Sequence, residues 1–397
     1  MKDKAEKRRR RGILTSGGFA HFIHDGFSDG LFVLLPLWAN AFGLSHSQVG
    51  FLKLCMTGTL AGFQMPAGFL AERLGERVVL SAGTILAGSG FVILAFADGF
   101  SALAVILIIA GIGTSVQHPL ASSIVSRAHD KSGRRAALGI YNFSGDLGKI
   151  AVPFTIAAVI AAFGWQTGTT LYGIIGILAG CIIFIVLSRL HSGDRPTVEK
   201  KRQERRKELG FGIHDRLGFF TLSAISMIDS SARIAFMTFL PFLLVSKGLE
   251  MKAVGFSLAL ILSGGAAGRL ICGFVAERLG ILRTVVLTEL ATGVLIFSII
   301  IADLKIAMFI LPILGVALNG TSSVLYGTVG DFVQQERQAR AFGIFYTLGV
   351  GAGAVAPLVY GSISDAFGLT VALFILASMV CLTLPLCLML RLPLSRN

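Results

Sequence analysis

Charged residues are scarce in this sequence, where Asp, Glu, Lys and Arg make up only 14% of 397 residues. A soluble globular domain carries about a quarter charged residues, so this composition excludes an ordinary soluble fold. Hydrophobic residues account for 54% of the chain and form runs of the length, roughly 20 residues, that crosses a bilayer as a helix. These runs do not alternate between polar and apolar residues, which excludes an outer-membrane barrel.

Motifs for metal, disulfide or nucleotide chemistry are also missing. The five cysteines fall in apolar runs without metal-ligand spacing, so we interpret them as small buried side chains. No G-x-x-x-x-G-K-[ST] segment occurs, which argues against transport driven by ATP. The seven histidines are scattered, so we predict no cofactor, no metal and no enzymatic activity. A membrane-embedded enzyme, with His21, His24 and Asp25 as a weak ligand set, is the remote alternative.

Twelve apolar runs predict twelve transmembrane helices, because backbone polar groups in lipid must find partners within their own segment. The runs lie near residues 14–40, 47–70, 78–97, 102–126, 136–162, 168–188, 217–245, 252–275, 284–303, 305–329, 341–363 and 369–390. We therefore predict an all-α membrane protein of two pseudo-symmetric six-helix bundles. The predicted parts are a basic N-terminus at 1–12, bundles at 13–189 and 216–391, a polar linker at 190–215 and a tail at 392–397.

The formal net charge of +13 is distributed in a pattern typical of membrane topology rather than of nucleic-acid binding. Basic residues gather at Lys2 to Arg11, in the linker from Arg195 to Lys207, and in alternate short loops at Arg73 and Arg77, Arg127 to Arg135, Arg278 and Arg283, and Arg337 and Arg340. This positive-inside pattern predicts a multi-pass protein of the cell (inner) membrane with both termini cytoplasmic. We interpret the linker as solvated, with a short helix on anionic lipid as the alternative.

The first apolar run follows a basic prefix, as in a secretory signal peptide. The run is too long for such a signal, and no small-residue cleavage site follows it. We therefore predict an uncleaved first span.

An internal repeat divides the chain into two similar halves. Residues 68–75 and 273–280 agree at seven of eight positions, at an offset of 205 (273 − 68). Later the offset becomes 204, where Gly139 faces Gly343 and Pro153 faces Pro357. A repeat of this length predicts two copies of one membrane-embedded unit with a cavity between them.

The repeated segment resembles a known family motif. Residues 68–77 are similar to G-x-L-a-D-r-x-G-r-r, which joins the second and third helices of the major facilitator superfamily. His-x-x-His-Asp in the first run and Gln-His-Pro in the fourth resemble the fosmidomycin-resistance branch. The resemblance implies a secondary transporter that works by alternating access. We predict efflux of a small drug-like or anionic compound by proton antiport, with proton-coupled uptake of a nutrient or metal chelate as the alternative.

The expected partners follow from this resemblance and from the composition. They are a small-molecule substrate, protons and the lipid bilayer, with no nucleic acid, and we expect a monomer.

The family motif also implies a cytoplasmic gate. Its residues here are Gly68, Glu72, Arg73, Gly75, Arg77, Gly273, Glu277, Arg278 and Gly280. The resemblance places Glu72 against the start of the eleventh helix, where a carboxylate gains about 0.3–1 kcal/mol from the helix dipole. It gives Glu277 a weaker contact with the fifth helix, and we expect Gly68 and Gly75 to allow close helix packing. This chain has Glu where the family prefers Asp. Anchoring of the loop to lipid head groups by Arg73 and Arg77 is the alternative.

Ionisable residues within the apolar runs are costly in lipid and are therefore functional candidates. The proton-coupling candidates are Asp25, Asp29, His24, His118, Asp146 and Lys149. His21, Asp25 and Asp29 share one helix face, and an imidazole titrates near neutral pH, so this ladder is suited to carry a proton. A solvated His21 at the cytoplasmic end and a structural Asp146–Lys149 pair are the alternatives.

The substrate-cavity candidates are Gln117, Asn142, Asp229, Arg233, Asn319, Tyr326 and Tyr346, with ordinary packing as the alternative for the amides and aromatics. Most titratable candidates lie in the first half. We therefore expect proton coupling there and substrate contact in the second half. The fourth run lacks the Arg of the family's drug antiporters, and we predict that Asp146, Lys149 and His118 take its place.

Overall fold

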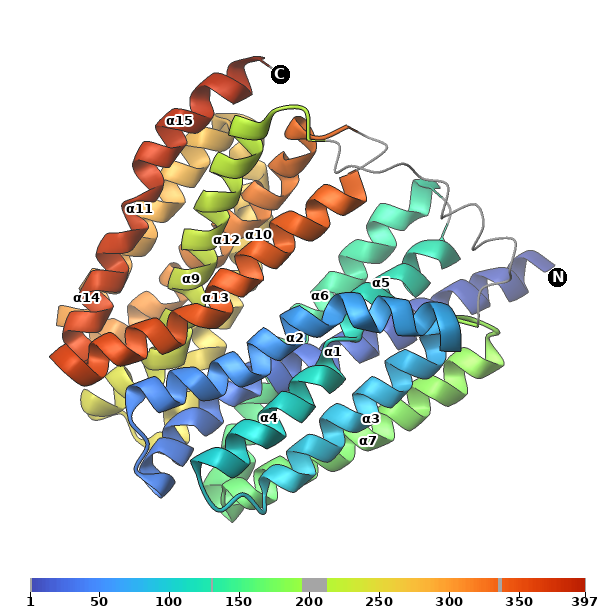
Figure 1. The fold of residues 1–397 in the computed structure, drawn as a ribbon, viewed down its shortest axis with the longest axis horizontal. Coiled ribbons are helices and arrows are strands. Elements are labelled where there is room, and N and C mark those ends of the chain that lie inside the picture. Colours follow the sequence, from blue (N-terminus) through green and yellow to red (C-terminus); the bar gives the residue numbers. More distant parts are fainter. Residues whose placement is uncertain (1, 130, 195–212, 335–337, 397) are drawn as a thin grey trace. The chain divides into compact units, whose positions relative to one another are not determined.

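The chain folds into helices connected by short turns (Figure 1). The computed structural model describes residues 2–129, 131–194, 213–334 and 338–396. In these ranges the only β pairing is an isolated bridge between Ile213 and Val333. The all-α prediction is therefore confirmed, as expected for apolar segments that must satisfy their own backbone groups in lipid.

The helices of the first half match the first six predicted runs. They are α1 (Lys2–Phe42), α2 (His46–Leu74), α3 (Glu76–Leu94), α4 (Phe100–Thr114), α5 (Gln117–Ala128), α6 (Lys131–Phe163) and α7 (Trp165–Arg189). The fourth span is broken into α4 and α5 at Ser115 and Val116. The hydroxyl groups of Thr114 and Ser115 donate to the carbonyls of Gly111 and Ile112, which satisfies backbone groups near the break.

The second half repeats this arrangement. Its elements are α9 (Arg216–Ser246), η1 (Met251–Ala253), α10 (Val254–Leu279), α11 (Ile281–Ile301), α12 (Leu304–Thr328), η2 (Val329–Phe332), α13 (Gln338–Phe367), α14 (Leu369–Val380) and α15 (Thr383–Arg396). Within the described ranges, ten helical stretches, from α3 onward, are long and apolar enough to cross a membrane. With the more polar α1 and α2 they form the twelve predicted spans. Residues 195–212, the core of the predicted linker, lie outside the described residues.

The chain divides into two compact units, one of Met1–Leu37 and Cys55–Lys207, the other of Trp38–Leu54 and Glu208–Asn397. The second unit thus includes the turn between α1 and α2. The backbone N–H groups of His46 and Ser47 donate to the two carboxylate oxygens of Asp365 on α13, at 2.8 and 2.9 Å. Asp365 therefore caps the N-terminus of α2, which otherwise has unsatisfied donors.

Each unit has its own hydrophobic core, and the two cores use corresponding positions. Tyr141 is buried in the first core and Phe345 in the second, at an offset of 204 (345 − 141). Helix pairing is also repeated: α3 packs on α4 and α7, and α11 packs on α12, α14 and α15. The sequence duplication is therefore a duplication of packing.

Close backbone contact recurs at corresponding glycines. A Cβ at Gly111 would lie 2.7 Å from the carbonyl oxygen of Met56, and a Cβ at Gly315 would lie 2.0 Å from that of Ile261. Glycine at these positions lets the second and fourth helices of each half touch through their backbones. Proteins pack membrane helices with small residues in this way because lipid supplies no hydrophobic drive between them.

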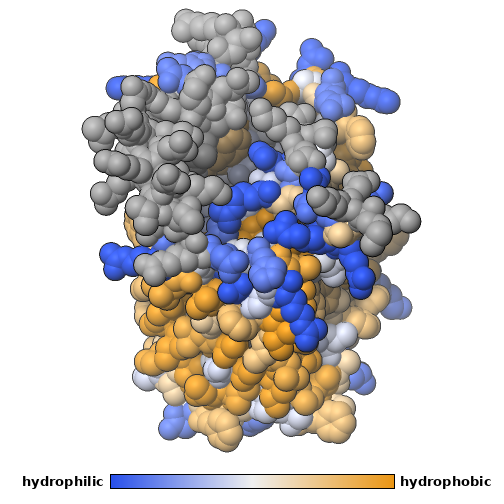
Figure 2. All heavy atoms as spheres, turned by 90° about the vertical axis from the view of Figure 1, so that its right-hand side faces the viewer, coloured by the Kyte–Doolittle hydropathy of each residue, from blue (hydrophilic) through white to orange (hydrophobic). Residues whose placement is uncertain are grey.

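Much of the surface is apolar. Phe96, Ile301 and Phe309 are each more than 70% exposed. Figure 2 shows that hydrophobic residues predominate over the lower part of one face, whereas most hydrophilic residues lie above them. Such a surface suits a bilayer. Cys181 on α7 and Cys381, in the turn between α14 and α15, are exposed, so the prediction of five buried cysteines was wrong for these two surface positions.

The backbone contact at Gly315 predicts a stability effect. Gly315→Ala is expected to destabilise the protein by about 1–3 kcal/mol, because the added methyl meets a backbone oxygen that must shift. The measurement is the unfolding temperature of the purified protein in detergent. Gly351→Ala on α13 is the matched control, since its Cβ would meet no described atom within 4 Å. An equal effect of both substitutions contradicts the prediction.

Candidate functional site

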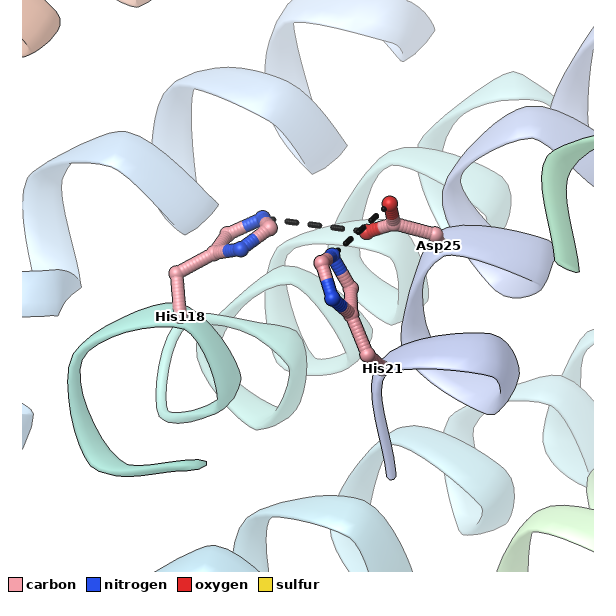
Figure 3. Close-up of side chains that lie close together, drawn as sticks. All are labelled: His21, Asp25 and His118. Carbon is pink, nitrogen blue, oxygen red and sulfur yellow. Dashed lines mark ion pairs between the residues drawn. The ribbon is translucent and has the colours of Figure 1, made fainter. Parts of the chain in front are cut away.

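A buried carboxylate, Asp25, lies at the centre of a polar cluster in the first unit (Figure 3). Its Oδ2 atom lies 3.1 Å from Nε2 of His21, one turn earlier on α1, and 3.1 Å from Nζ of Lys149 on α6. Its Oδ1 atom lies 3.7 Å from Nε2 of His118 on α5. Lys149 is also 3.8 Å from Asp146. The structure therefore brings together four of the six proton-coupling candidates and adds His21.

Two glycines allow α6 to approach α1 at this point. A Cβ at Gly145 would lie 2.5 Å from Nε2 of His21, and a Cβ at Gly148 would lie 2.2 Å from the carbonyl oxygen of Phe22. Any larger residue would push the helices apart. The Gly-Asp-Leu-Gly-Lys sequence thus brings Lys149 close enough to neutralise Asp25.

The contacts of His21 indicate that the cluster holds a proton. Its Nδ1 atom lies 2.9 Å from the carbonyl oxygen of Tyr141, which can only accept a hydrogen bond. Its Nε2 atom faces the carboxylate of Asp25. With acceptors on both sides, the ring is best satisfied as an imidazolium with two N–H donors. His21 is 5% exposed, so the alternative of a solvated interfacial histidine was wrong.

The charges of the cluster support the same assignment. Asp25 and Asp146 supply two negative charges, and Lys149 supplies one positive charge. One additional proton, on His21 or His118, makes the cluster neutral. Neutrality is favoured because an uncompensated charge inside a membrane protein is costly.

His21, Asp25 and His118 also have a spacing that a metal ion tolerates, with one ligand atom from each within 4.8 Å of the others. The ammonium group of Lys149 already lies against the Asp25 oxygen at 3.1 Å. A metal cation would have to displace or repel that ammonium group. We therefore interpret the cluster as a network of ion pairs rather than a metal centre.

The other first-half candidates lie around this cluster. His24 Nε2 lies 2.8 Å from the hydroxyl oxygen of Thr84, which itself donates to the carbonyl of Leu80, so His24 donates to Thr84. The amide of Gln117 donates to the hydroxyl of Tyr141 at 2.8 Å. Asp29 is half-buried and Asn142 is exposed.

In the second unit, Asp229 and Asn319 are buried, and Arg233 is half-buried and donates to Ser230 at 3.3 Å. Tyr326 and Tyr346 are exposed, and the ring of Tyr326 packs on Phe342. These residues stay predictions as substrate contacts.

Two buried charged residues were not among the predicted site residues. Glu289 on α11 is 2% exposed and lies close to Asp229, and Lys53 on α2 is 3% exposed. Both lie in predicted spans, so the cost of an ionisable residue in lipid was the available signal.

The gate motif is anchored within the first unit through residues that follow the repeated octapeptide. Arg77 forms a 2.7 Å ion pair with Asp194, and Glu76 pairs with Arg127 and accepts a 2.9 Å hydrogen bond from Ser123. Arg77 therefore has a partner within the protein, whereas the alternative interpretation gave it only lipid head groups as partners. The second copy has Ile281 and Leu282 at the corresponding positions, so it lacks this anchor.

The motif glycines act differently from our expectation. Gly75 and Gly280 have φ angles of 93° and 86°, which side chains disfavour, so they form the turns before α3 and α11. A Cβ at Gly68 or Gly273 would meet no described atom within 4 Å. The expected close helix packing at Gly68 is therefore absent from the described residues.

The acids and remaining bases of the motif lie near the surface. Glu72, Arg73, Glu277 and Arg278 are all exposed. Residues 335–337, just before the eleventh span, lie outside the described residues, so the expected contact of Glu72 stays a prediction.

Comparisons with known proteins agree with this geometry. The sequence profile of the family described as Major Facilitator Superfamily matches residues 17–357 and 222–397. A fosmidomycin resistance protein of Escherichia coli (strain K12) is 25% identical over 366 residues, covering 89% of this chain and 86% of that protein. A probable sulfoacetate transporter of Cupriavidus necator is 24% identical over 362 residues, covering 85% and 83%.

Solved structures show the same fold. A bacterial homologue of the human lysosomal transporter Spinster, in an inward-facing and unoccupied conformation, superposes with a TM-score of 0.80 at 16% identity, covering 98% of each chain. A peptide transporter crystallised with sulfate gives a TM-score of 0.77 at 16% identity, covering 96% of this chain and 94% of that one. The family and these relatives are transporters, in keeping with the prediction of a protein that is not an enzyme.

The Asp25–Lys149 pair predicts a non-additive stability effect. Lys149→Gln is expected to destabilise the protein by roughly 1–3 kcal/mol, because it leaves a buried carboxylate with less compensation. The double variant Asp25→Asn/Lys149→Gln is expected to recover part of this loss, since it removes both charges. Unfolding in detergent provides the measurement.

A control for this cycle is Lys252→Gln, which removes the same charge from an exposed pair with Glu250. It is expected to leave the unfolding temperature unchanged. Purely additive effects of the two substitutions in the cluster would show that Asp25 and Lys149 do not depend on each other.

Proposed function

Because the chain belongs to the Major Facilitator Superfamily and is a membrane transporter of small solutes, we propose that it exports a small drug-like or anionic compound in exchange for protons. The observation that carries the proton coupling is the buried cluster of His21, Asp25, His118, Asp146 and Lys149. It has two acids, one permanent base and two imidazoles.

A proton can enter or leave this cluster at small energetic cost, because its groups compensate one another. Asp25 is shared by His21, His118 and Lys149, which come from three helices, so a change in the charge of one group alters the attraction between α1, α5 and α6. Binding or release of a proton thereby favours one helix arrangement over another. A two-state element that responds to a proton is what coupled transport needs.

The chemical class of the solute is supported by the relatives. Sulfoacetate, hexuronate, 4-hydroxybenzoate and gallate, named for four of them, are small organic anions. The half-buried cations Lys149 and Arg233 are suited to attract an anion once substrate displaces part of their ion pairing. Resistance to fosmidomycin, named for another relative, favours export. Uptake by proton symport is the second candidate, favoured by the relatives named for nutrient-like anions.

The setting follows the distribution of basic residues. We propose that the protein acts as a monomer in the cell (inner) membrane with both termini in the cytoplasm, since the Lys- and Arg-rich loops mark the cytoplasmic face. The repeated motif then lies on that face, where Glu72 is proposed to hold the cytoplasmic gate shut.

Proton coupling through Asp25 predicts the outcome of a transport assay. Asp25→Asn is expected to reduce solute movement driven by a pH gradient to background, because the amide cannot exchange a proton with His21. Cells that overexpress or lack the protein are first compared for sensitivity to a panel of small anions and drug-like compounds. Each hit is then tested with everted vesicles and with proteoliposomes under an imposed pH gradient.

Asp98→Asn is the control, because Asp98 is an exposed acid in the turn between α3 and α4. It is expected to transport at the parental rate. Parental transport by Asp25→Asn, or no movement of any compound by folded parent protein, would count against the proposed function. The sign of the gradient that drives accumulation distinguishes export from uptake.

The gate predicts a difference between the two motif copies. Glu72→Gln is expected to abolish transport at normal expression, because the amide loses the charge that favours a helix N-terminus. Glu277→Gln in the weaker second copy is expected to retain more activity. The measurement is transport per unit of protein in the membrane, and full activity of Glu72→Gln would refute the gate.

A further inference from the structure

The second unit contains a pair of buried acids that the first-half cluster does not involve. Asp229 on α9 is 3% exposed and Glu289 on α11 is 2% exposed. Their carboxyl groups lie close enough to each other for a side-chain hydrogen bond. Two ionised carboxylates have only acceptors and repel each other, so such a bond requires a proton on one of them.

The described side chains around the pair offer no other hydrogen-bond donor to its two buried oxygens, so the shared proton must serve as the donor. Among the described residues, neither Asp229 Oδ2 nor Glu289 Oε2 has another hydrogen-bond donor. The hydroxyl group of Thr321 on α12 donates to the hydroxyl of Thr288 at 2.7 Å. An isolated ionised oxygen would be costly at this depth, whereas a shared proton satisfies both groups.

Arg233 completes the local charge balance. It lies one turn after Asp229 on α9, and its positive charge attracts the Asp229 carboxylate. Cys387 on α15 lies close enough to Glu289 for the two side chains to interact electrostatically. The spans that surround α9 and α11 hold further titratable side chains, among them Arg269 and Cys272 on α10, Tyr326 on α12, and Tyr346 and Tyr360 on α13. With one proton, the set of Asp229, Glu289 and Arg233 is neutral, and without it the set is negative.

The internal repeat explains how the pair is placed. His24 and Thr84, which are hydrogen-bonded between α1 and α3, correspond to Asp229 and Glu289 at the same offset of 205 (229 − 24 and 289 − 84). The duplicated fold therefore sets a polar side chain of its first span near one of its third span in both halves. In the second half both partners have become acids.

We infer that Asp229 and Glu289 together form a second proton-binding site, which holds one proton between α9 and α11. Loss of the proton places two like charges side by side, and their repulsion drives the two side chains apart. The ligand of this site is a proton, and both groups that bind it belong to the second half. Its part in coupling rests on the proposed function, but its occupancy by a proton does not.

Infrared difference spectroscopy of the purified full chain tests this site, since a protonated carboxyl group has its own C=O stretching band. Spectra are compared between near-neutral and alkaline pH, in H₂O and D₂O. The expected result is a band in the parent that shifts in D₂O and is lost at alkaline pH. Glu289→Gln and Asp229→Asn are each expected to remove it, whereas Glu250→Gln, an exposed acid, and Asp25→Asn are expected to retain it.

A second variant guards against misfolding. Asp229→His/Glu289→Thr recreates the pair found at His24 and Thr84, and it is expected to fold without the band, as judged by size-exclusion elution and circular dichroism. Absence of the band from the parent, or its persistence in both Glu289→Gln and Asp229→Asn, overturns the inference. A band that behaves as expected in protein that moves no solute upholds this site while the proposed function fails.

Discussion

The need to compensate a charge buried away from water determines the arrangement of the first unit. Asp25 is 4% exposed, and its two oxygens face basic groups from α1, α5 and α6. Removing a charged pair from water costs several kcal/mol per ion unless geometry and hydrogen bonding repay it. Two features of the fold supply this compensation. The glycines of α6 let Lys149 approach the Asp25 carboxylate, and α5, which begins after the break in the fourth span, places His118 beside it.

The features predicted from sequence are those that repeat along the chain. Apolar runs give the number and order of the helices, and the offsets of 205 and 204 give corresponding positions in the two halves. The contact of Gly111 with Met56 in the first half corresponds to that of Gly315 with Ile261 in the second half. The sequence shows that the two glycines correspond, but not which residue each of them contacts. Helix periodicity and an internal duplication are both patterns of the sequence itself, so they can be predicted without knowing which distant residues meet.

The features that escaped prediction depend on contacts between distant residues. His21 and Asp25 are neighbours on one helix face, so their pairing was predictable, but the carbonyl of Tyr141 that makes His21 a double donor lies on another helix. Glu289 looked like one acid in an apolar run. Its partner Asp229 is 60 residues earlier (289 − 229), and only the fold shows that the two meet. The segment Trp38–Leu54 was assigned by sequence to the first bundle. It belongs to the second unit because its backbone is hydrogen-bonded to Asp365 near the end of α13, a distant residue that the sequence does not reveal as its partner.

The two halves solve the same electrostatic problem with different residues. In each, two acids are set against one permanent base: Asp25 and Asp146 with Lys149, and Asp229 and Glu289 with Arg233. One proton balances either set, but the first half offers imidazoles to hold it and the second half offers only carboxyl groups. Imidazoles exchange protons near neutral pH, whereas a carboxyl pair holds its proton by mutual repulsion of the ionised forms. A division of roles, with coupling in one half and substrate contact in the other, therefore does not follow from counting titratable groups. It depends on which set a solute disturbs, and each set contains one permanently charged base.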